Sequence, residues 1–380
     1  MTTGTLSRRD FARAVGFAMG ATLVAPALPE SLYARLGPGM SGEWIQLNAN
    51  ENPYGPSAGA REAMTRSQQI AARYPDHVEG QLVEAIAKLH GVAPENILLG
   101  CGSSEILSMA DTAFTTPDKN VVVAEPTYEA VLGYARLTRA ESIKVPLTGD
   151  FRHDLPAMAA VVSERTGLVY VCNPNNPTGT IVTRFELAAF LRSVPKTAVI
   201  LVDEAYYHFA EDPRYASAFE WLATTPNLVI ARTFSKIYGM AGMRLGYAVA
   251  SKELIAQMRP RRIMNNANAS VLEAALASLG DPAHVPQHRK LMNDTRKWLV
   301  KELERDGRRY IPSEANFVMI DVGGDVQPIG QKFRERRILV GRKFPSLGNW
   351  LRVSVGTPEE MKEFMAALRE IVPAQAGRAA

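Results

Sequence analysis

Lys236 is the first residue that could do chemistry, because a serine and a guanidinium lie close to its amine in the sequence. It follows Ser235 and precedes Arg244 by eight residues, within the segment RTFSKIYGMAGMR, residues 232–244. A lysine amine can form a covalent bond with a carbonyl group, and a nearby guanidinium can bind an anion. The segment therefore predicts either a site for an anionic, reactive ligand or two cations that only solvate a loop.

Residues 100–105, GCGSSE, are typical of a turn that binds an anion. A glycine turn after an apolar segment leads to Ser103 and Ser104 at the expected start of a helix. Free backbone N–H groups at a helix start bind phosphate readily, and hydroxyl groups beside them add donors. The same residues are also consistent with a simple helix cap that has Glu105 in its first turn.

Residues 173–179, NPNNPTG, combine two Asn-Pro steps with a Thr-Gly turn after a strand-like segment. Proline restricts the backbone, so the carboxamides of Asn173, Asn175 and Asn176 are held in place, and an Asn-Pro bond can be cis. Such rigidity favours a role in which one carboxamide meets an oxygen of a ligand.

Asp203 ends the most apolar strand-like segment, AVILVDE, and Tyr206 follows it by three residues. A carboxylate there is costly to bury unless a cation or a strong hydrogen-bond donor pairs with it. Asp203 could instead cap the next helix. Together with the anion-binding turn, the rigid carboxamides and Lys236, it describes a site for a phosphorylated aromatic aldehyde with a protonated ring nitrogen. Pyridoxal phosphate is such a molecule, and a lysine binds its aldehyde.

The elements that would position these groups alternate along the chain. Short apolar segments rich in β-branched residues have the length of strands, and helical patterns such as residues 105–114 and 186–192 separate them. The expected strands span residues 96–100, 121–125, 142–147, 168–172, 198–204, 228–233 and 245–250. This alternation predicts an α/β fold with an open, largely parallel sheet covered on both faces. Ligands of such sheets bind beyond the carboxyl ends of the strands.

The pattern changes after about residue 262 and predicts a smaller α+β domain at the C-terminus. A long helical stretch is followed by three strand-like segments and a final helix: residues 270–305, 315–322, 337–341, 350–356 and 358–371. The extended segment WIQLNANENPYGPS, residues 44–57, has no strand partner of its own and is expected to lie across a domain boundary. The predicted division is a connector and N-terminal arm, a large domain and a small domain, at residues 28–60, 61–262 and 263–380.

Residues 1–27 are predicted to be a twin-arginine signal peptide. Arg8 and Arg9 lie in the segment SRRDF, a weakly apolar stretch follows, and small residues suited to cleavage occupy positions 25–27. The apolar stretch is too short for stable membrane insertion. We therefore expect export of the folded protein to the periplasm. The alternative is an amphipathic helix that packs on the body of the protein.

Composition and charge argue against several other classes of protein. The net charge is only +4, and no run of Lys and Arg is interleaved with aromatic residues, so nucleic-acid binding is not expected. Cys101 and Cys172 are too few for a disulfide framework and wrongly spaced for zinc. His284 and His288 have the spacing of helical metal ligands, but Pro286 between them argues against a shared helical face, so we expect no metal site.

At these residues the sequence resembles the fold-type I pyridoxal-phosphate-dependent aminotransferases, most closely the histidinol-phosphate aminotransferase-like branch. The resemblance extends from residue 47 to the last helix. It rests on motifs that occur in this order: NANENPYGPS, RYPD, GCGSSE, EPTYE, NPNNPTG, DEAY, SK with Arg eight residues on, ANFV and LRVSVGT. It implies a large domain that binds pyridoxal 5'-phosphate, a smaller C-terminal domain, and a homodimer.

The resemblance also implies a role for each residue that binds the cofactor ring. Lys236 would hold the cofactor and carry the substrate proton, and Asp203 would face the ring nitrogen. Tyr206 and Asn176 would bind the ring hydroxyl. Tyr128 would stack on the ring face.

Further roles concern the phosphate and the substrate. The implied phosphate shell consists of Ser103, Ser104, Ser235 and Arg244. Tyr74 would reach the phosphate of the neighbouring subunit, so that a homodimer shares its two active sites. Arg352 would bind the substrate carboxylate through its planar fork. Asn50, with Asn48 and Asn52, belongs to the N-terminal arm that closes over the substrate.

These roles imply an aminotransferase that moves an amino group from an amino acid, or a related amine, to a 2-oxo acid. Two other enzymatic activities are also consistent with these residues. One is a pyridoxal-phosphate-dependent decarboxylase or lyase on the same scaffold, and the other is a true histidinol-phosphate aminotransferase. A cofactor-binding sensor domain without enzymatic activity is a weaker alternative. Such a sensor would need an attached DNA-binding module, which the sequence does not show, and the intact lysine favours an enzyme.

Overall fold

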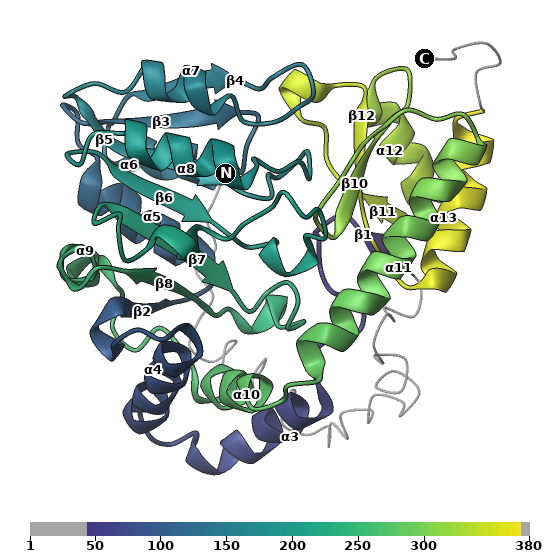
Figure 1. The fold of residues 1–380 in the computed structure, drawn as a ribbon. Helices are drawn as coiled ribbons and strands as arrows, with labels where there is room; N and C mark the ends of the chain where they lie inside the picture. The colour runs from purple at the N-terminus through teal and green to yellow at the C-terminus, as the bar shows by residue number, and fades with distance from the viewer. Residues whose placement is uncertain (1–43, 374–380) are drawn as a thin grey trace, which may run out of the picture.

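The computed structural model describes residues 44–373 of the 380-residue chain (Figure 1). The predicted signal peptide and residues 28–43 of the predicted connector and N-terminal arm lie outside the described residues. The structure has two lobes, which Figure 1 shows with the large sheet on the left and the C-terminal strands and helices on the right.

A seven-stranded sheet forms the centre of the larger lobe, with strand order β2-β8-β7-β6-β5-β3-β4. The strands are β2 (Ile97–Gly100), β3 (Asn120–Glu125), β4 (Ser142–Pro146), β5 (Thr166–Cys172), β6 (Val199–Asp203), β7 (Leu228–Thr233) and β8 (Gly246–Ala250). Only β8 is antiparallel to its neighbours in this sheet. The predicted largely parallel α/β sheet is therefore confirmed.

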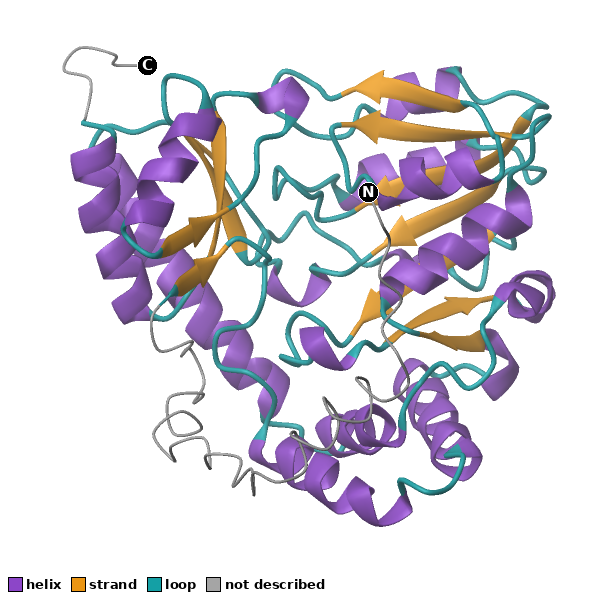
Figure 2. Ribbon diagram, turned by 180° about the vertical axis from the view of Figure 1, so that it is seen from behind, coloured by secondary structure: helices purple, strands orange, loops and turns teal. Residues whose placement is uncertain are grey.

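Alternate residues of the strands pack into separate cores on the two faces of the sheet. Val121 and Val123 of β3 contact the core beneath α5, α6 and α9, whereas Val122 faces the core beneath α7 and α8. Burial on both faces explains why these strands are continuous apolar runs. The helices are α5 (Ser103–Phe114), α6 (Ala130–Leu137), α7 (Leu155–Ala160), α8 (Arg184–Ser193) and α9 (Lys252–Met258). Figure 2 shows helices in front of and behind the strands.

The smaller lobe has the α+β composition expected from the sequence. An antiparallel sheet of order β12-β10-β9 packs against three helices. Its elements are β9 (Tyr310–Ile311), β10 (Phe317–Asp321), β12 (Trp350–Ser354), α11 (His284–Arg305), α12 (Val326–Glu335) and α13 (Pro358–Ile371). Residues 44–57, called the N-terminal arm below, begin with β1 (Ile45–Leu47), which pairs in parallel with β11 (Ile338–Val340). The prediction that this arm has no strand partner was therefore wrong.

The helical stretch predicted over residues 270–305 is two helices. α10 (Ala269–Leu279) ends at Gly280, and α11 begins at His284 after an Asp-Pro step. Proline has no N–H and disfavours helix in the residue before it, which explains the break. α10 packs against α3 (Ala58–Arg66) and α4 (Asp76–His90) of the larger lobe. The predicted domain boundary at residues 262 and 263 stays a prediction, and α10, on its C-terminal side, packs on the larger lobe.

Pro286 lies in the first turn of α11, where a missing N–H breaks no helical hydrogen bond. His284 and His288 consequently share a face of the helix, with ring centroids 4.1 Å apart. The expectation that Pro286 would separate these two histidines was wrong. Within residues 44–373 no group of three or more His, Cys, Asp or Glu side chains is placed to hold a metal ion.

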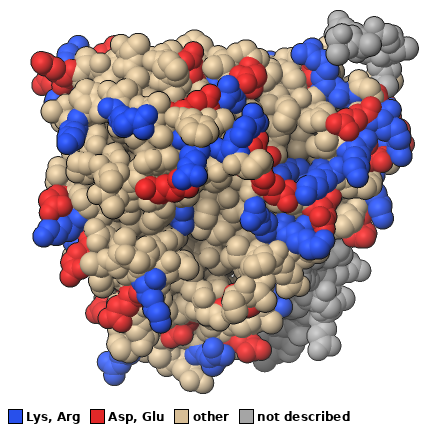
Figure 3. All heavy atoms as spheres, viewed as in Figure 1, with Lys and Arg blue, Asp and Glu red and all other residues tan. Residues whose placement is uncertain are grey.

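The surface and the short helices complete the description. Figure 3 shows Lys and Arg interspersed with Asp and Glu over the viewed face. No helix in the described part of the chain is both long and apolar enough to cross a membrane. Short 3-10 helices occur at Ser67–Ile70, Pro94–Asn96, Tyr207–Phe209, Ala218–Trp221, Ala241–Met243, Arg259–Arg261 and Pro345–Leu347.

Candidate active site

A cavity of about 360 Å³ opens between the carboxyl ends of the parallel strands, the N-terminal arm and β12. It brings together all the site residues predicted from the sequence except Tyr74. Those that line it are Asn50, Ser103, Ser104, Tyr128, Asn176, Asp203, Tyr206, Ser235, Lys236, Arg244 and Arg352. The sequence predicted this meeting point because parallel strands end at a common edge.

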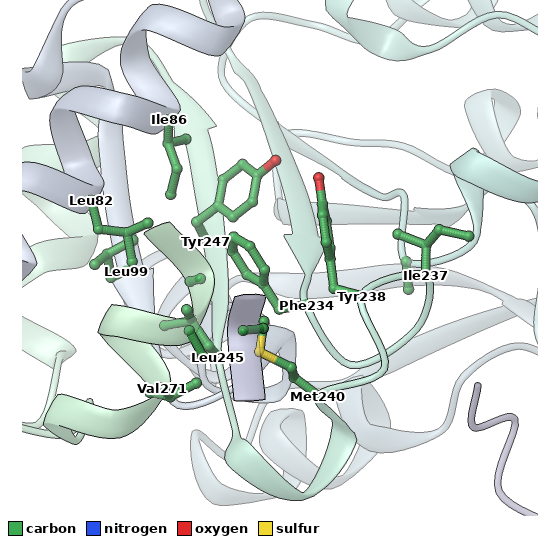
Figure 4. Packing of buried hydrophobic residues seen from close by; sticks show 14 of the residues in the cluster. Leu82, Ile86, Leu99, Phe234, Ile237, Tyr238, Met240, Leu245, Tyr247 and Val271 are labelled. Carbon is green, nitrogen blue, oxygen red and sulfur yellow. The ribbon is translucent and has the colours of Figure 1, made fainter. Parts of the chain in front are cut away.

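Lys236 lies on the loop after β7. Residues before and after it in the sequence are buried in the core, which anchors this loop. Phe234 and Tyr238 pack among buried side chains of β8, α4 and α10 (Figure 4). The Lys236 amine donates to the carbonyl oxygens of Asn50, at 3.1 Å, and Ala49, at 3.3 Å. Burial, with the nearby charge of Arg352, lowers its pKa to about 8. The neutral, nucleophilic amine is therefore accessible near neutral pH.

Asp203 ends β6 and is buried, at 2% exposure. Its carboxyl group accepts from the Tyr170 hydroxyl at 3.0 Å and from the Ala205 N–H at 3.1 Å. Burial raises its pKa to about 6. Both donors are neutral, so a protonated nitrogen in the cavity would be a favourable partner for this carboxylate.

The Tyr206 hydroxyl is held by two carboxamides. Asn50 and Asn176 donate to it through their Nδ2 atoms at 3.1 and 3.3 Å. Because the hydroxyl oxygen accepts both bonds, its own proton remains free to donate into the cavity. Burial raises the Tyr206 pKa, which keeps this proton in place at neutral pH.

The N-terminus of α5 lies at the cavity, where the sequence predicted an anion cradle. Gly102 caps the helix with a φ of 76°, and no side chain caps it. A Cβ atom at Gly102 would overlap the guanidinium of Arg244. Arg244 in turn donates to Ser235 Oγ at 3.3 Å. Glu105 lies in the first turn and accepts the N–H of Cys101 at 2.5 Å, one residue before the cap, so the side-chain cap that the sequence left open does not form.

Arg352 reaches the cavity from β12 and is 9% exposed. It donates from Nη1 to Asn176 Oδ1 at 2.7 Å and from Nη2 to the Asn48 carbonyl at 2.8 Å. Its buried Nε atom finds no hydrogen-bond partner among the described residues. An unpaired buried donor on a cation favours an anionic ligand beside it.

Tyr74 lies apart from this cavity. Its side chain is 76% exposed at the start of α4, so a single chain does not bring it to the site. The predicted role at the phosphate of a neighbouring subunit stays a prediction.

The sequence reasoning missed two groups that support the site. Tyr170 lies on β5, and the β5–β6 register pairs Cys172 with Asp203, which brings the Tyr170 hydroxyl to the carboxylate. Arg232, in the strand before the Lys236 loop, and Glu204 form a buried ion pair at 2.7 Å. The acidic pair DE and the Arg of LVIART were visible signals, but only the pairing of strands connects them.

A comparison with known protein families settles the membership of the chain. The family described as Aminotransferase class I and II matches residues 42–368. The chain belongs to this family.

The relatives of this aminotransferase include curated and solved proteins of one name. It is 40% identical over 331 residues to the histidinol-phosphate aminotransferase of Moorella thermoacetica, covering 86% of this chain and 85% of the relative. A putative histidinol-phosphate aminotransferase from Erwinia carotovora atroseptica has a TM-score of 0.84 and 35% identity, over 86% of this chain and 95% of its own. The Sinorhizobium meliloti enzyme, solved with pyridoxal-5'-phosphate, has a TM-score of 0.81 and 27% identity, over 87% and 91%.

The protein is thus a pyridoxal-phosphate-dependent aminotransferase with the fold-type I architecture. The residues present fit this cofactor: the free hydroxyl proton of Tyr206 suits a ring hydroxyl, the buried carboxyl of Asp203 suits a protonated ring nitrogen, and the cradle at Gly102 suits a phosphate. When bound, pyridoxal phosphate supplies an electron sink for the carbanion formed at the substrate. Lys236 would hold it covalently.

Proposed function

We propose that this aminotransferase takes the amino group of an amino acid, or a related amine with an anionic group, and passes it to a 2-oxo acid. The observation that supports this most directly is the Arg352 fork. Its Nε is buried without a partner, and the same cavity contains Lys236 and Asp203. A carboxylate held there would fix the substrate beside the lysine amine.

The side chains of this chain would divide the work as follows. Arg352 would orient the substrate through its carboxylate, so that the bond to be broken is held in a fixed direction. When its amine is free of the cofactor, Lys236 would act as the general base that takes the proton from the substrate carbon and gives it back, because its lowered pKa suits a base near neutral pH. Asp203 would favour a protonated ring nitrogen, and Tyr206 would donate a hydrogen bond to the ring hydroxyl.

Histidinol phosphate is a second candidate substrate, because curated relatives at 36–40% identity carry that name. Gly341 cannot be replaced by a residue whose side chain binds the substrate phosphate, because a Cβ atom there would overlap the backbone of Arg352. The next residue, Arg342, does line the cavity and pairs with Glu129 at 2.5 Å. The predicted export argues against histidinol phosphate as the substrate, since an exported enzyme would be separated from histidine synthesis.

A panel of amino donors tests the function. Purified enzyme is incubated with pyridoxal phosphate and each donor, including histidinol phosphate, with 2-oxoglutarate as acceptor. We expect conversion of 2-oxoglutarate to glutamate with at least one carboxylate-bearing donor, and a reversible change of the cofactor absorption. Release of carbon dioxide without glutamate would instead support the decarboxylase, and turnover of histidinol phosphate alone would support the second candidate.

We further propose a homodimer with shared sites. The support is the family resemblance together with Tyr74, an aromatic side chain 76% exposed within the RYPD motif. The described ranges contain further exposed apolar side chains at Ile263 and Met264. Large apolar side chains at a surface often mark a protein interface.

We also propose that residues 1–27 direct export to the periplasm. The support is the sequence alone: the twin arginines, the weakly apolar stretch and the small residues near position 27. A twin-arginine route carries folded proteins, which suits an enzyme that binds its cofactor before export.

A further inference from the structure

Two histidines of α11 lie behind the loop that carries Lys236, outside the cavity that binds the cofactor. His284 is 2% exposed and His288 is 9% exposed. The ring of Tyr238, two residues after Lys236, stacks parallel to His284 at an interplanar angle of 3°. The stacked rings of Tyr238 and His284 therefore connect the Lys236 loop to α11 of the smaller lobe.

The hydrogen bonds of this cluster can be assigned from the donors and acceptors that each group has. Asn52 accepts the N–H of Tyr54 through Oδ1 at 3.1 Å, which places its NH₂ group toward the histidines. One of its hydrogens goes to the Ile237 carbonyl and the other to His288 Nδ1, both at 2.8 Å. His288 Nδ1 is therefore an acceptor.

The Ile237 carbonyl receives a second bond from the same helix. His284 Nε2 lies 3.2 Å from this oxygen. Because a carbonyl only accepts, His284 must carry its proton on Nε2. His284 is thus a donor and His288 an acceptor, and both serve the carbonyl next to Lys236, one directly and one through Asn52.

The N-terminal arm and the Lys236 loop also touch through their backbones. A Cβ atom at Gly239 would overlap the carbonyl group of Gly55, so the two segments pack without a side chain between them. Gly239 has a φ of 67°. The Asn52 bond and this backbone contact hold the arm against the loop at two points.

The arm is the element that receives the Lys236 amine. Asn50 accepts from Lys236 Nζ through its carbonyl and donates to Tyr206 through its side chain. Asn50 is two residues from Asn52, with φ of 55°, so a shift of Asn52 would be transmitted through a short, bent piece of backbone. The position of the reactive amine and of the Tyr206 hydroxyl both depend on this piece.

We propose that His284 and His288 are positioning residues of the aminotransferase: they hold Asn52 and the Ile237 carbonyl, and so fix the N-terminal arm against the loop of Lys236. The proposal rests on Lys236 as the residue that holds the cofactor. It makes α11 of the smaller lobe a support of the active site that it does not touch.

The test uses substitutions that place a polar amide atom near the position of one of the two histidine ring nitrogens, and leucine, which replaces neither. An asparagine places an amide oxygen near the position of a histidine Nδ1, and a glutamine places an amide nitrogen near that of Nε2. We expect His288→Asn to resemble the original protein and His288→Gln and His288→Leu not to. At the other position we expect the reverse, with His284→Gln retaining function and His284→Asn and His284→Leu losing it.

Two measurements are made on each variant. Hydrogen exchange of the cofactor-free full chain is followed in peptides covering residues 48–56 and 234–240, where we expect roughly tenfold faster exchange in the failing variants. With cofactor and substrate, we expect kcat to fall about tenfold with little change in KM, because misplacing a reacting group affects the chemical step. The pH midpoint of the visible absorption of the loaded enzyme should shift in the same variants.

A matched control separates positioning from packing. His90 contacts Tyr247 Oη at 2.9 Å and stacks on Phe219, far from the arm in the sequence. His90→Leu should lower Tm without faster exchange in residues 48–56. If His288→Asn behaved no better than His288→Gln, or if His288→Leu left exchange in the arm unchanged, the proposal would be wrong. Exchange in the cofactor-free chain reports whether the histidines hold Asn52 and the Ile237 carbonyl, even if Lys236 proves not to hold the cofactor. A failure of this proposal and a failure of the proposed function are therefore distinguishable.

Discussion

At the scale of single residues, burial adjusts the groups that would react. It lowers the pKa of Lys236 from 10.5 to about 8 and raises that of Asp203 from 3.8 to about 6. Both shifts have the same physical cause, because a poorly solvated site disfavours the charged form of either group. Near neutral pH the cavity thus leaves a fraction of the Lys236 amine neutral, while most of the Asp203 carboxyl stays ionised.

The Lys236 amine should titrate with a midpoint near pH 8 in the cofactor-free protein. Its rate of reaction with pyridoxal phosphate should rise through pH 8 and then level off. Arg352→Met should move the midpoint upward, because the Arg352 charge contributes to the lowered pKa. The measurement is the pH dependence of cofactor attachment, and a midpoint close to 10.5 would contradict it. Since the folded-state pKa lies below the ordinary value, this group also makes the free energy of unfolding increase from about pH 8 toward 10.5.

Replacing Asp203 by asparagine tests the partner of the ring nitrogen. The amide oxygen can still accept the Ala205 N–H, so Asp203→Asn should fold. We expect kcat/KM to fall roughly hundredfold or more, as when a preorganised electrostatic group is removed from an active site. Tyr170→Phe, which removes only the hydroxyl donor, should cost much less. Equal losses in the two variants would show that the charge of Asp203 is not what matters.

At the scale of elements, the start of α5 and the loop after β7 line one cavity, and we expect them to bind one anion together. The cradle depends on Gly102, since its positive φ and the adjacent Arg244 leave no space for a side chain. Helix N-termini attract phosphate through their N–H groups, and Arg244 adds a full charge. This arrangement explains why glycine precedes the two serines.

Gly102→Ala should weaken cofactor binding about tenfold or more, through strain at positive φ and displacement of Arg244. The dissociation constant for pyridoxal phosphate, measured by absorption titration, checks this. Gly133→Ala is the matched control, because a Cβ atom there has nothing within 4 Å and the residue lies inside α6. That control should bind normally and be slightly more stable. Normal binding by the Gly102 variant would argue against a phosphate cradle.

At the scale of the whole molecule, the proposed dimer makes a prediction about mixed subunits. Lys236→Ala and Tyr74→Ala should each be nearly inactive if Tyr74 completes the site of its neighbour. When the two are expressed together, each mixed dimer should contain one site with both residues intact. Activity should then reappear, and light scattering should report a dimer mass. Failure of complementation in a confirmed mixed dimer would mean that the sites are not shared.

Export can be checked independently of activity. Arg8→Lys with Arg9→Lys should leave the protein in the cytoplasm of a host with a working twin-arginine pathway, whereas the unchanged chain should reach the periplasm shortened at its N-terminus. Cell fractionation and N-terminal mass measurement test this. A full-length chain in the cytoplasm in both cases would contradict the proposed signal.

Much of the site could be predicted from the sequence because its residues follow the ends of apolar strands. Asp203 ends such a strand, Lys236 and Asn176 each follow one, and parallel strands end at one edge of the sheet. Apolar runs and glycine or proline stops record local burial and backbone shape, which are properties of neighbouring residues. The α/β fold and the cavity follow from these local signals.

Tertiary structure alone decided which distant segments meet. The pairing of β1 with β11, the bond from Tyr170 to Asp203 and the clamp of Asn52 by His288 each join residues whose sequence separation carries no pattern. Asn52 and His288 are 236 residues apart. Such contacts depend on how whole helices and strands pack, and a periodic pattern along one segment contains no information about the partner that packing selects.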